Sequence, residues 1–202
     1  MIIIVARYNE NVEWAKQFAS VLIYNKGLEL NGFTNVINTE NVGREGHTYY
    51  KYICDNYDKL EDYMIFLQGN PFDHSPNIIS NINKYIDKYN NNNNNNNKTI
   101  DVNFAYFSEL ILSCNLIDCI HHPGLQLMEI YNKIFIEPIS PTTEYIFGAG
   151  SQFIVSKLQV LKRPKSFYEK IVKILDYSIN PIEGYIIERF HGLVFNTENI
   201  WL

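Results

Sequence analysis

The feature that most constrains the fold is an uninterrupted apolar run at residues 63–67, which passes directly into a polar loop at 68–74. A short apolar run that ends at Gly and Pro is typical of a buried strand. A second apolar run, at residues 2–6, is followed directly by the polar quartet 7–10. Ligands of α/β proteins bind beyond the ends of such strands, so the two strand ends predict one site across a sheet edge.

Length and composition predict one folded α/β domain over residues 1–202, since 46% of its residues are hydrophobic. The net charge of −5 argues against a nucleic-acid partner bound through a broad basic surface. No segment reaches the roughly 18–20 apolar residues of a membrane span, and the start lacks the pattern of an export signal. The three cysteines have no C-x-x-C spacing, which favours reduced, buried thiols and a cytoplasmic location.

The order of the predicted elements indicates the fold class. Strand-like and helical patterns alternate through the first half of the chain, which predicts a single mixed, mostly parallel sheet flanked by helices, a Rossmann-like α/β architecture. We expect strands at 2–6, 21–24, 35–37, 63–67, 102–106, 145–147 and 152–155, and helices after Asn11 and at 43–58, 125–135, 166–177 and 183–190. The asparagine run at 90–97 has no apolar anchor and predicts a solvated loop insertion.

The quartet Arg7-Tyr8-Asn9-Glu10 is the first candidate binding segment. After a first strand it can hold a nucleotide or a sugar, with Arg7 binding phosphate and Asn9 and Glu10 binding hydroxyls. The alternative is a capping turn before the next helix.

A second candidate segment contains Asn41, Gly43, Arg44 and Glu45. Gly43 permits a tight turn, and the predicted helix start there offers backbone N–H groups and the positive end of a dipole. Arg44 adds charge, which suits an anion such as a diphosphate. The alternative is that Glu45 only balances the dipole and Arg44 is a solvated surface group.

Asp73 and His74 form a candidate metal pair, with Gln68 as a nearby hydrogen-bonding group. Oxygen and imidazole ligands suit Mn²⁺ or Zn²⁺ better than Ca²⁺. A third ligand has to come from elsewhere, and the available imidazoles are those of His121, His122 and His191. The alternative is that Asp73 caps the helix that follows.

Two C-terminal segments complete the candidates. Glu188 and His191 lie three residues apart on a predicted helix, so they share a face and can act as base and ligand, or form a structural contact. The small residues of 148–152 allow close approach of a ligand, or form only a tight turn. No Ser-His-Asp order, P-loop or HExxH motif is present.

These motifs, in this order, resemble the uncharacterised family called domain of unknown function 3431. The resemblance rests on residues 5–10, 41–49, 66–74, 148–156 with Arg163-Pro164, and 188–191. It covers nearly the whole chain apart from the asparagine run. The family implies no established activity.

The chain is also similar, more distantly, to glycosyltransferases of the GT-A type, in which the turn after the first strand meets the nucleotide. This resemblance implies a GT-A-like fold and an acceptor-side role for Gly150, Ser151 and Gln152. It places residues 68–74 where that fold has its Asp-x-Asp metal motif, which this sequence lacks. Asp73 and His74, with His191, are then the substitute ligands for Mn²⁺ or Mg²⁺, and Glu188 is the base.

Three functions follow as hypotheses. The first is transfer of a sugar from a nucleotide sugar to a glycan or other hydroxyl acceptor. The second is a metal-dependent hydrolase of a phosphate or glycosidic bond, in which Asp73, His74, His191 and Glu188 activate water. The third is a non-catalytic carbohydrate-binding or interaction module.

Overall fold

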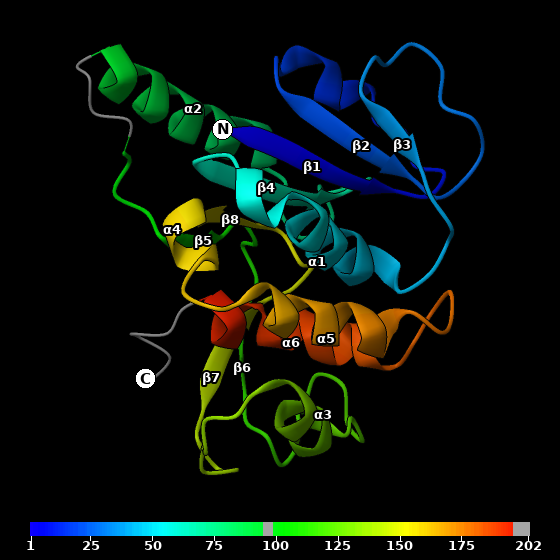
Figure 1. The fold of residues 1–202 in the computed structure, drawn as a ribbon, viewed down its shortest axis with the longest axis vertical. Coiled ribbons are helices and arrows are strands. Elements are labelled where there is room, and N and C mark those ends of the chain that lie inside the picture. The colour runs from blue at the N-terminus through cyan, green and yellow to red at the C-terminus, as the bar shows by residue number, and fades with distance from the viewer. Residues whose placement is uncertain (95–98, 196–202) are drawn as a thin grey trace.

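The computed structural model describes residues 1–94 and 99–195, and a six-stranded sheet forms its centre (Figure 1). The strand order is β3-β2-β1-β4-β8-β5. Strand β1 pairs in parallel with β2 and β4, and β2 pairs in parallel with β3, whereas β8 runs antiparallel between β4 and β5. The predicted mixed, mostly parallel α/β sheet is therefore confirmed. The strands are β1 (Ile2–Arg7), β2 (Val21–Asn25), β3 (Val36–Asn38), β4 (Tyr63–Gln68), β5 (Phe104–Tyr106) and β8 (Phe153–Ser156).

Helices cover both faces of this sheet, as the continuous apolar strands require. Successive residues of β1 point to opposite faces, so Ile4 enters one core and Ile3 and Val5 enter the other. The first core is the larger and is rich in aromatic rings. It involves α1 (Arg44–Asn56), α5 (Lys165–Leu175) and α6 (Glu183–Phe195), and the second involves α2 (Ile78–Asn94).

A two-stranded sheet lies beyond α5 and α6 in Figure 1. It consists of β6 (Ile111–Cys114) antiparallel to β7 (Tyr145–Gly148), and α3 (Leu127–Ile134) lies between them in sequence. The sequence did not predict β6, because its four residues carry no clear alternation. Two short 3-10 helices, η1 (Glu13–Gln17) and η2 (Tyr57–Lys59), and α4 (Lys157–Val160) complete the described elements.

Two predictions of local structure differ from the fold. The helix expected after Asn11 is the short 3-10 helix η1, although the Asn11 side chain does accept a bond from the Glu13 backbone N–H at 2.9 Å. The loop expected at 90–97 is helical as far as Asn94, and 95–97 lie outside the described residues. Helix propagation is cheaper than nucleation, so an amphipathic helix that begins at Ile78 extends into neutral residues.

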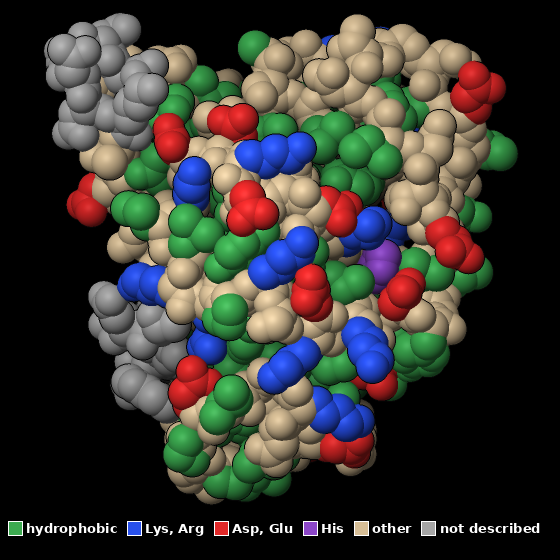
Figure 2. Space-filling model, viewed as in Figure 1, with side chains coloured by type: hydrophobic (Ala, Val, Ile, Leu, Met, Phe, Trp, Pro, Cys, Tyr) green, Lys and Arg blue, Asp and Glu red, His purple; other side chains and the backbone are tan. Residues whose placement is uncertain are grey.

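The face viewed in Figure 2 carries interspersed Lys, Arg, Asp and Glu side chains. Over its described residues this face has no continuous basic surface. Within 1–94 and 99–195, no helix has both the length and the apolarity needed to cross a bilayer.

Candidate functional site

The candidate site lies where the order of the strands in the sheet reverses, between β1 and β4. Strand β1 has β2 on one side and β4 on the other, so the carboxyl ends of β1 and β4 meet at a topological switch point. Ala6 is paired there with Gln68. Open α/β sheets bind ligands in the crevice at this position. The two polar strand ends therefore lie side by side at one edge of the sheet, as the sequence predicted.

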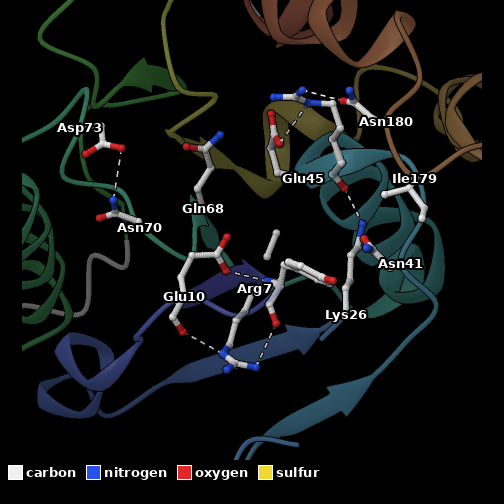
Figure 3. Close-up of a pocket in the computed structure, with 13 residues that line it drawn as sticks. Arg7, Glu10, Lys26, Asn41, Glu45, Gln68, Asn70, Asp73, Ile179 and Asn180 are labelled. Carbon is white, nitrogen blue, oxygen red and sulfur yellow. Dashed lines mark hydrogen bonds and ion pairs between the residues drawn. The ribbon is translucent and has the colours of Figure 1, made fainter. Parts of the chain in front are cut away.

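A pocket of about 630 Å³ opens at this switch point (Figure 3). Eight residues predicted as site residues line it: Arg7, Tyr8, Glu10, Asn41, Arg44, Glu45, Gln68 and Asp73. Lys26, Asn70, Ile179 and Asn180 also line it and were not predicted as site residues. The pocket thus combines three cationic side chains with three carboxylates and several amides.

Arg7 belongs to the framework of the pocket. Its Nε donates to the Glu10 carbonyl at 2.9 Å, and its Nη1 donates to the Leu28 carbonyl at 3.0 Å and to the Tyr8 carbonyl at 3.1 Å. The same Nη1 donates to Asn25 Oδ1, which turns the guanidinium toward β2 and away from Gln68 and Glu45 (Figure 3). Arg7 therefore ties the loop after β1 to the loop after β2.

The rest of the quartet divides between framework and pocket. Asn9 lies outside the pocket lining, and its Oδ1 accepts a bond from the Leu28 N–H at 2.8 Å. The Glu10 carboxylate accepts from the Tyr8 N–H at 2.6 Å. A Cβ at Gly69 would lie 2.6 Å from this carboxylate, so the glycine after β4 is what makes room for Glu10. The Tyr8 ring is half exposed at the mouth of the pocket.

Lys26 is the cation that sequence reasoning missed. It follows β2 directly, and its Nζ donates to the Val42 carbonyl at 2.6 Å and to the Arg44 carbonyl. Burial lowers the pKa of Lys26 to about 8, although the neighbouring Glu45 carboxylate works in the opposite direction. A lysine immediately after a strand that neighbours β1 was the available signal.

Arg44 connects two helix starts at the pocket wall. Its Nη1 donates to Asn180 Oδ1 at 2.8 Å, and its guanidinium lies 4.2 Å from the ring centre of Tyr185. Its Nε is buried and has no hydrogen-bond partner among the described atoms. The Glu45 carboxylate lies 3.7 Å from that Nε. Arg44 is thus engaged through Nη1 and the face of its guanidinium group, while its Nε–H donates to no described atom.

Gly43 shapes the backbone before α1. Its φ of +65° is in the left-handed region, and a Cβ there would lie 2.4 Å from the Cβ of His47. Within 1–94 and 99–195, the two non-glycine residues with positive φ are Arg44 and Ser151, at +52° and +56°. Both belong to segments predicted to bind ligand, and local backbone strain of this kind clusters at functional sites.

The loop after β4 delivers Asp73 and Gln68 to the pocket. Asp73 is exposed, and its carboxylate accepts from the Asn70 side-chain amide at 3.2 Å. His74 packs instead against the loop between β7 and β8: a Cβ at Gly150 would lie 2.7 Å from the His74 ring. Asp73 therefore lies at the pocket, whereas the adjacent His74 packs against Gly150.

The predicted metal set is not assembled by this fold. His191 is fully buried, its Nδ1 is hydrogen-bonded to the Tyr50 hydroxyl at 2.8 Å, and its ring centre lies 4.7 Å from that of Phe153. Within the described ranges, no three His, Cys, Asp or Glu side chains are grouped as metal ligands. Asp73, His74 and His191 consequently do not fit a divalent cation as a shared donor set, since the third ligand is enclosed in an aromatic core.

Glu188 lies on α6 and is not among the residues that line the pocket, although the lining residues Glu45 and Arg44 are close enough to influence its pKa. Its Oε1 accepts a bond from the Gly150 N–H at 2.7 Å, and its Oε2 lies 3.4 Å from Arg189 Nη1. Burial raises the pKa of Glu188, and the nearby Glu45 carboxylate adds to this, whereas the Gly150 N–H and the two arginines lower it. A carboxylate with a raised pKa beside a cleft is suited to proton transfer.

The loop between β7 and β8 supports Glu188 from the other side. Gly150 adopts a φ of +88°, which presents its N–H to the carboxylate. Ser151 and Gln152 are buried, and neither Ser151 Oγ nor Gln152 Oε1 has a hydrogen-bond partner among the described atoms. Gln152 Nε2 donates to the Pro71 carbonyl at 3.0 Å, so this loop is joined to the loop after β4.

Comparisons with known proteins complete the description of the site. Neither the search of curated proteins nor that of solved structures gives a match. Residues 2–201 match the family model described as a protein of unknown function, DUF3431. The match includes every segment that lines the pocket, as well as Glu188 and the loop that supports it. The chain therefore belongs to the DUF3431 family, as its motifs predicted.

Proposed function

We propose that this protein binds a nucleotide sugar in the switch-point pocket and transfers the sugar to a hydroxyl acceptor. The observation that carries the proposal is the pocket itself, which lies at the ligand-binding edge of a mostly parallel sheet. It places Lys26 and Arg44 on one wall and the carboxylate and amide groups of Glu10, Gln68 and Asp73 on another. An anion with a hydroxyl-rich group attached matches both walls.

The proposed roles follow from where each group lies. Lys26 and Arg44 bind the diphosphate and stabilise the charge that develops on it as the sugar leaves. Tyr8 offers an exposed ring face for a base or a sugar. Glu10 and Gln68, which follow β1 and β4, bind hydroxyl groups. Arg7 fixes the loop on which Tyr8 and Glu10 stand.

Glu188 is the proposed general base for the acceptor hydroxyl. Burial and the Glu45 carboxylate hold the pKa of Glu188 above its usual value, which makes the carboxylate a stronger base once ionised. The Gly150 N–H and Arg189 hold its two oxygens in place. We assign no step to a divalent cation, because the predicted ligands are not grouped, and Lys26 and Arg44 stabilise the charge on the leaving group instead.

A thermal-shift screen against nucleoside diphosphates and nucleotide sugars tests the binding step. A ligand that binds only the folded state raises Tm by mass action. We expect one nucleotide to raise Tm in the wild type and in Asp87→Ala, an exposed site on α2, and to raise it much less in Asp73→Ala and Gln68→Ala. The absence of a shift with every nucleotide would remove the basis of the proposal.

Product analysis tests the chemical step. Sugar transferred to an added hydroxyl acceptor, and lost in Glu188→Gln, supports the transferase. Free sugar or phosphate formed without an acceptor identifies a hydrolase instead. Nucleotide or carbohydrate binding without turnover identifies a binding module. Circular dichroism of Glu188→Gln shows whether that variant retains the fold.

A further inference from the structure

A buried arginine connects the candidate base to a pair of cysteines that the proposed reaction does not use. Arg189 lies on α6 next to Glu188, and its Nη1 donates to the Tyr185 carbonyl at 2.6 Å and lies 3.4 Å from Glu188 Oε2. Its Nε donates to the sulfur of Cys119 at 3.2 Å. One guanidinium therefore contacts a carboxylate with one nitrogen and a thiol sulfur with another.

The second cysteine lies beside the first. Cys114 ends β6, Cys119 follows it within the irregular segment before α3, and each thiol influences the pKa of the other through a side-chain hydrogen bond. The Tyr145 hydroxyl donates to Cys114 Sγ at 3.4 Å. The Cys114 Sγ also donates to the carbonyl of Asp118, the residue before Cys119, at 3.8 Å. The two cysteines are therefore neighbours on a short loop and can approach each other without a change in the main sheet.

The surroundings of Cys119 favour its thiolate form. Burial raises the pKa of Cys119, but donation from Arg189 and from Cys114 outweighs burial and holds the pKa below its usual value. Burial raises the pKa of Cys54, on α1, to about 11. The thiolate is the form that reacts with oxidants, so the chain contains one activated cysteine and an internal reference.

We propose that Cys119 is a site of oxidation by hydrogen peroxide and that it closes to a disulfide with Cys114. The Cys119 thiolate attacks one peroxide oxygen, which forms an S–O bond and releases hydroxide. The Cys114 sulfur then attacks the Cys119 sulfur, the S–O bond breaks, and water leaves with the Cys114 proton. The two sulfurs lose two electrons in total, and the peroxide is reduced to water.

Access to Cys119 comes from the segment around it. Cys119 itself is buried, but its neighbour Ile120 is 81% exposed, and residues 115–124 form neither a helix nor a strand. Segments of this kind open locally at low free-energy cost. Opening of this segment exposes the sulfur to a molecule as small as peroxide.

Oxidation also changes the charge next to Glu188, a consequence that rests on the proposed function. In the reduced protein Arg189 is shared between the Cys119 sulfur and the Glu188 carboxylate. A disulfide carries no negative charge, so the guanidinium is left with the carboxylate as its anionic partner. We expect the acidic limb of the transfer pH profile to move to lower pH in the oxidised protein.

The experiment that tests the proposal is peptide mapping of the full chain after limited peroxide treatment, without reduction. We expect a linked Cys114–Cys119 peptide, and loss of the free Cys119 thiol at least about tenfold faster than that of Cys54. This comparison within one molecule needs no variant and no activity. Equal rates for Cys119 and Cys54, or a linked peptide that involves Cys54, would overturn the proposal.

Two variants assign the order of the steps. In Cys114→Ser, the Cys119 sulfenic acid has no partner and accumulates as a dimedone adduct, whereas in Cys119→Ser the remaining Cys114 stays reduced. A dimedone adduct on Cys114 in place of Cys119 would contradict the assigned nucleophile. Because the readout is covalent mass, a failed nucleotide screen leaves this result intact, and a failed mapping leaves the proposed transfer intact.

Discussion

The switch-point pocket and the interior of α6 both contain polar side chains, but these are accessible at the pocket and buried on α6. At the pocket, Asp73 and Gln68 reach an open crevice. On α6, His191 and Arg189 are enclosed by other side chains. Arg189 bonds Tyr185 and Cys119, and His191 bonds Tyr50 through Nδ1, while its buried Nε2 has no partner among the described atoms. Polar side chains therefore line an open crevice in one region and are packed inside the protein in the other. The two regions differ in the solvent accessibility of these side chains.

Two arginines at the pocket differ in a similar way. Arg7 is buried and donates to four protein oxygens, whereas Arg44 is partly exposed and retains a buried nitrogen without a partner. Arg7 stabilises the loop, whereas about a quarter of the Arg44 side chain stays exposed at the pocket. The following predictions test whether these differences are as large as the contacts imply.

The largest effect is expected for His191→Ala. Removing a fully buried ring that packs on Phe153 and bonds Tyr50 leaves a cavity and an unpaired hydroxyl, at a cost of about 3–5 kcal/mol of unfolding free energy. Urea unfolding measures this change. Asp73→Ala is the matched variant at the pocket, expected to stay within about 0.5 kcal/mol of the wild type. If His191→Ala also left the free energy of unfolding nearly unchanged, the two regions would not differ in stability as expected.

Arg7→Met is expected to cost somewhat less, about 2–4 kcal/mol, because it leaves three carbonyl oxygens and the buried Asn25 Oδ1 without their donor. Thermal and urea unfolding should agree on the loss. A variant that keeps full stability but loses nucleotide binding would move Arg7 from the framework to the ligand contacts.

Acid is expected to destabilise the protein through its buried histidines. Burial lowers the pKa of His47 to about 4 and that of His191 to about 3, from 6.5 in the unfolded chain. Between these values the unfolded chain binds protons that the native state does not. The stabilisation is therefore complete above pH 6.5 and is lost as the pH falls toward 4.

His47→Gln isolates this effect from that of the carboxylates. The raised pKa of Glu188 acts in the opposite direction, because the native state then takes up that proton first. Urea midpoints measured from pH 7 to pH 4 should fall less steeply in His47→Gln than in the wild type. Equal slopes would mean that His47 is protonated in the folded protein as readily as in the unfolded one.

A small effect on stability is expected for Arg44→Met, about 1 kcal/mol or less, because it loses one hydrogen bond to Asn180 and the contact with the ring of Tyr185. Its effect on ligand binding should be larger, about tenfold in nucleotide Kd, because a cation is removed from the pocket. Isothermal titration calorimetry with the nucleotide found in the screen measures this. Lys84→Met, at an exposed site on α2, is the matched control for removal of a charge.

Several elements could be read from the sequence because their signals are local. The apolar runs that became β1 and β4, and the periodic pattern of α1 and α5, were predicted to within a few residues. Strand β6 and the helical part of the asparagine run were not. Both depend on neighbours: β6 on pairing with β7, and residues 90–94 on a helix that begins at Ile78.

The sequence by itself determined the α/β class and the two polar strand ends that meet at the pocket, because burial of continuous apolar runs leaves a parallel sheet as the simplest solution. The tertiary structure decided which of the candidate residues share a site. It brought Lys26 to the pocket, enclosed His191 in an aromatic core and placed the Gly150 N–H against the Glu188 carboxylate. Such distances depend on strand order and on the packing of α6, which bring together residues far apart in the chain.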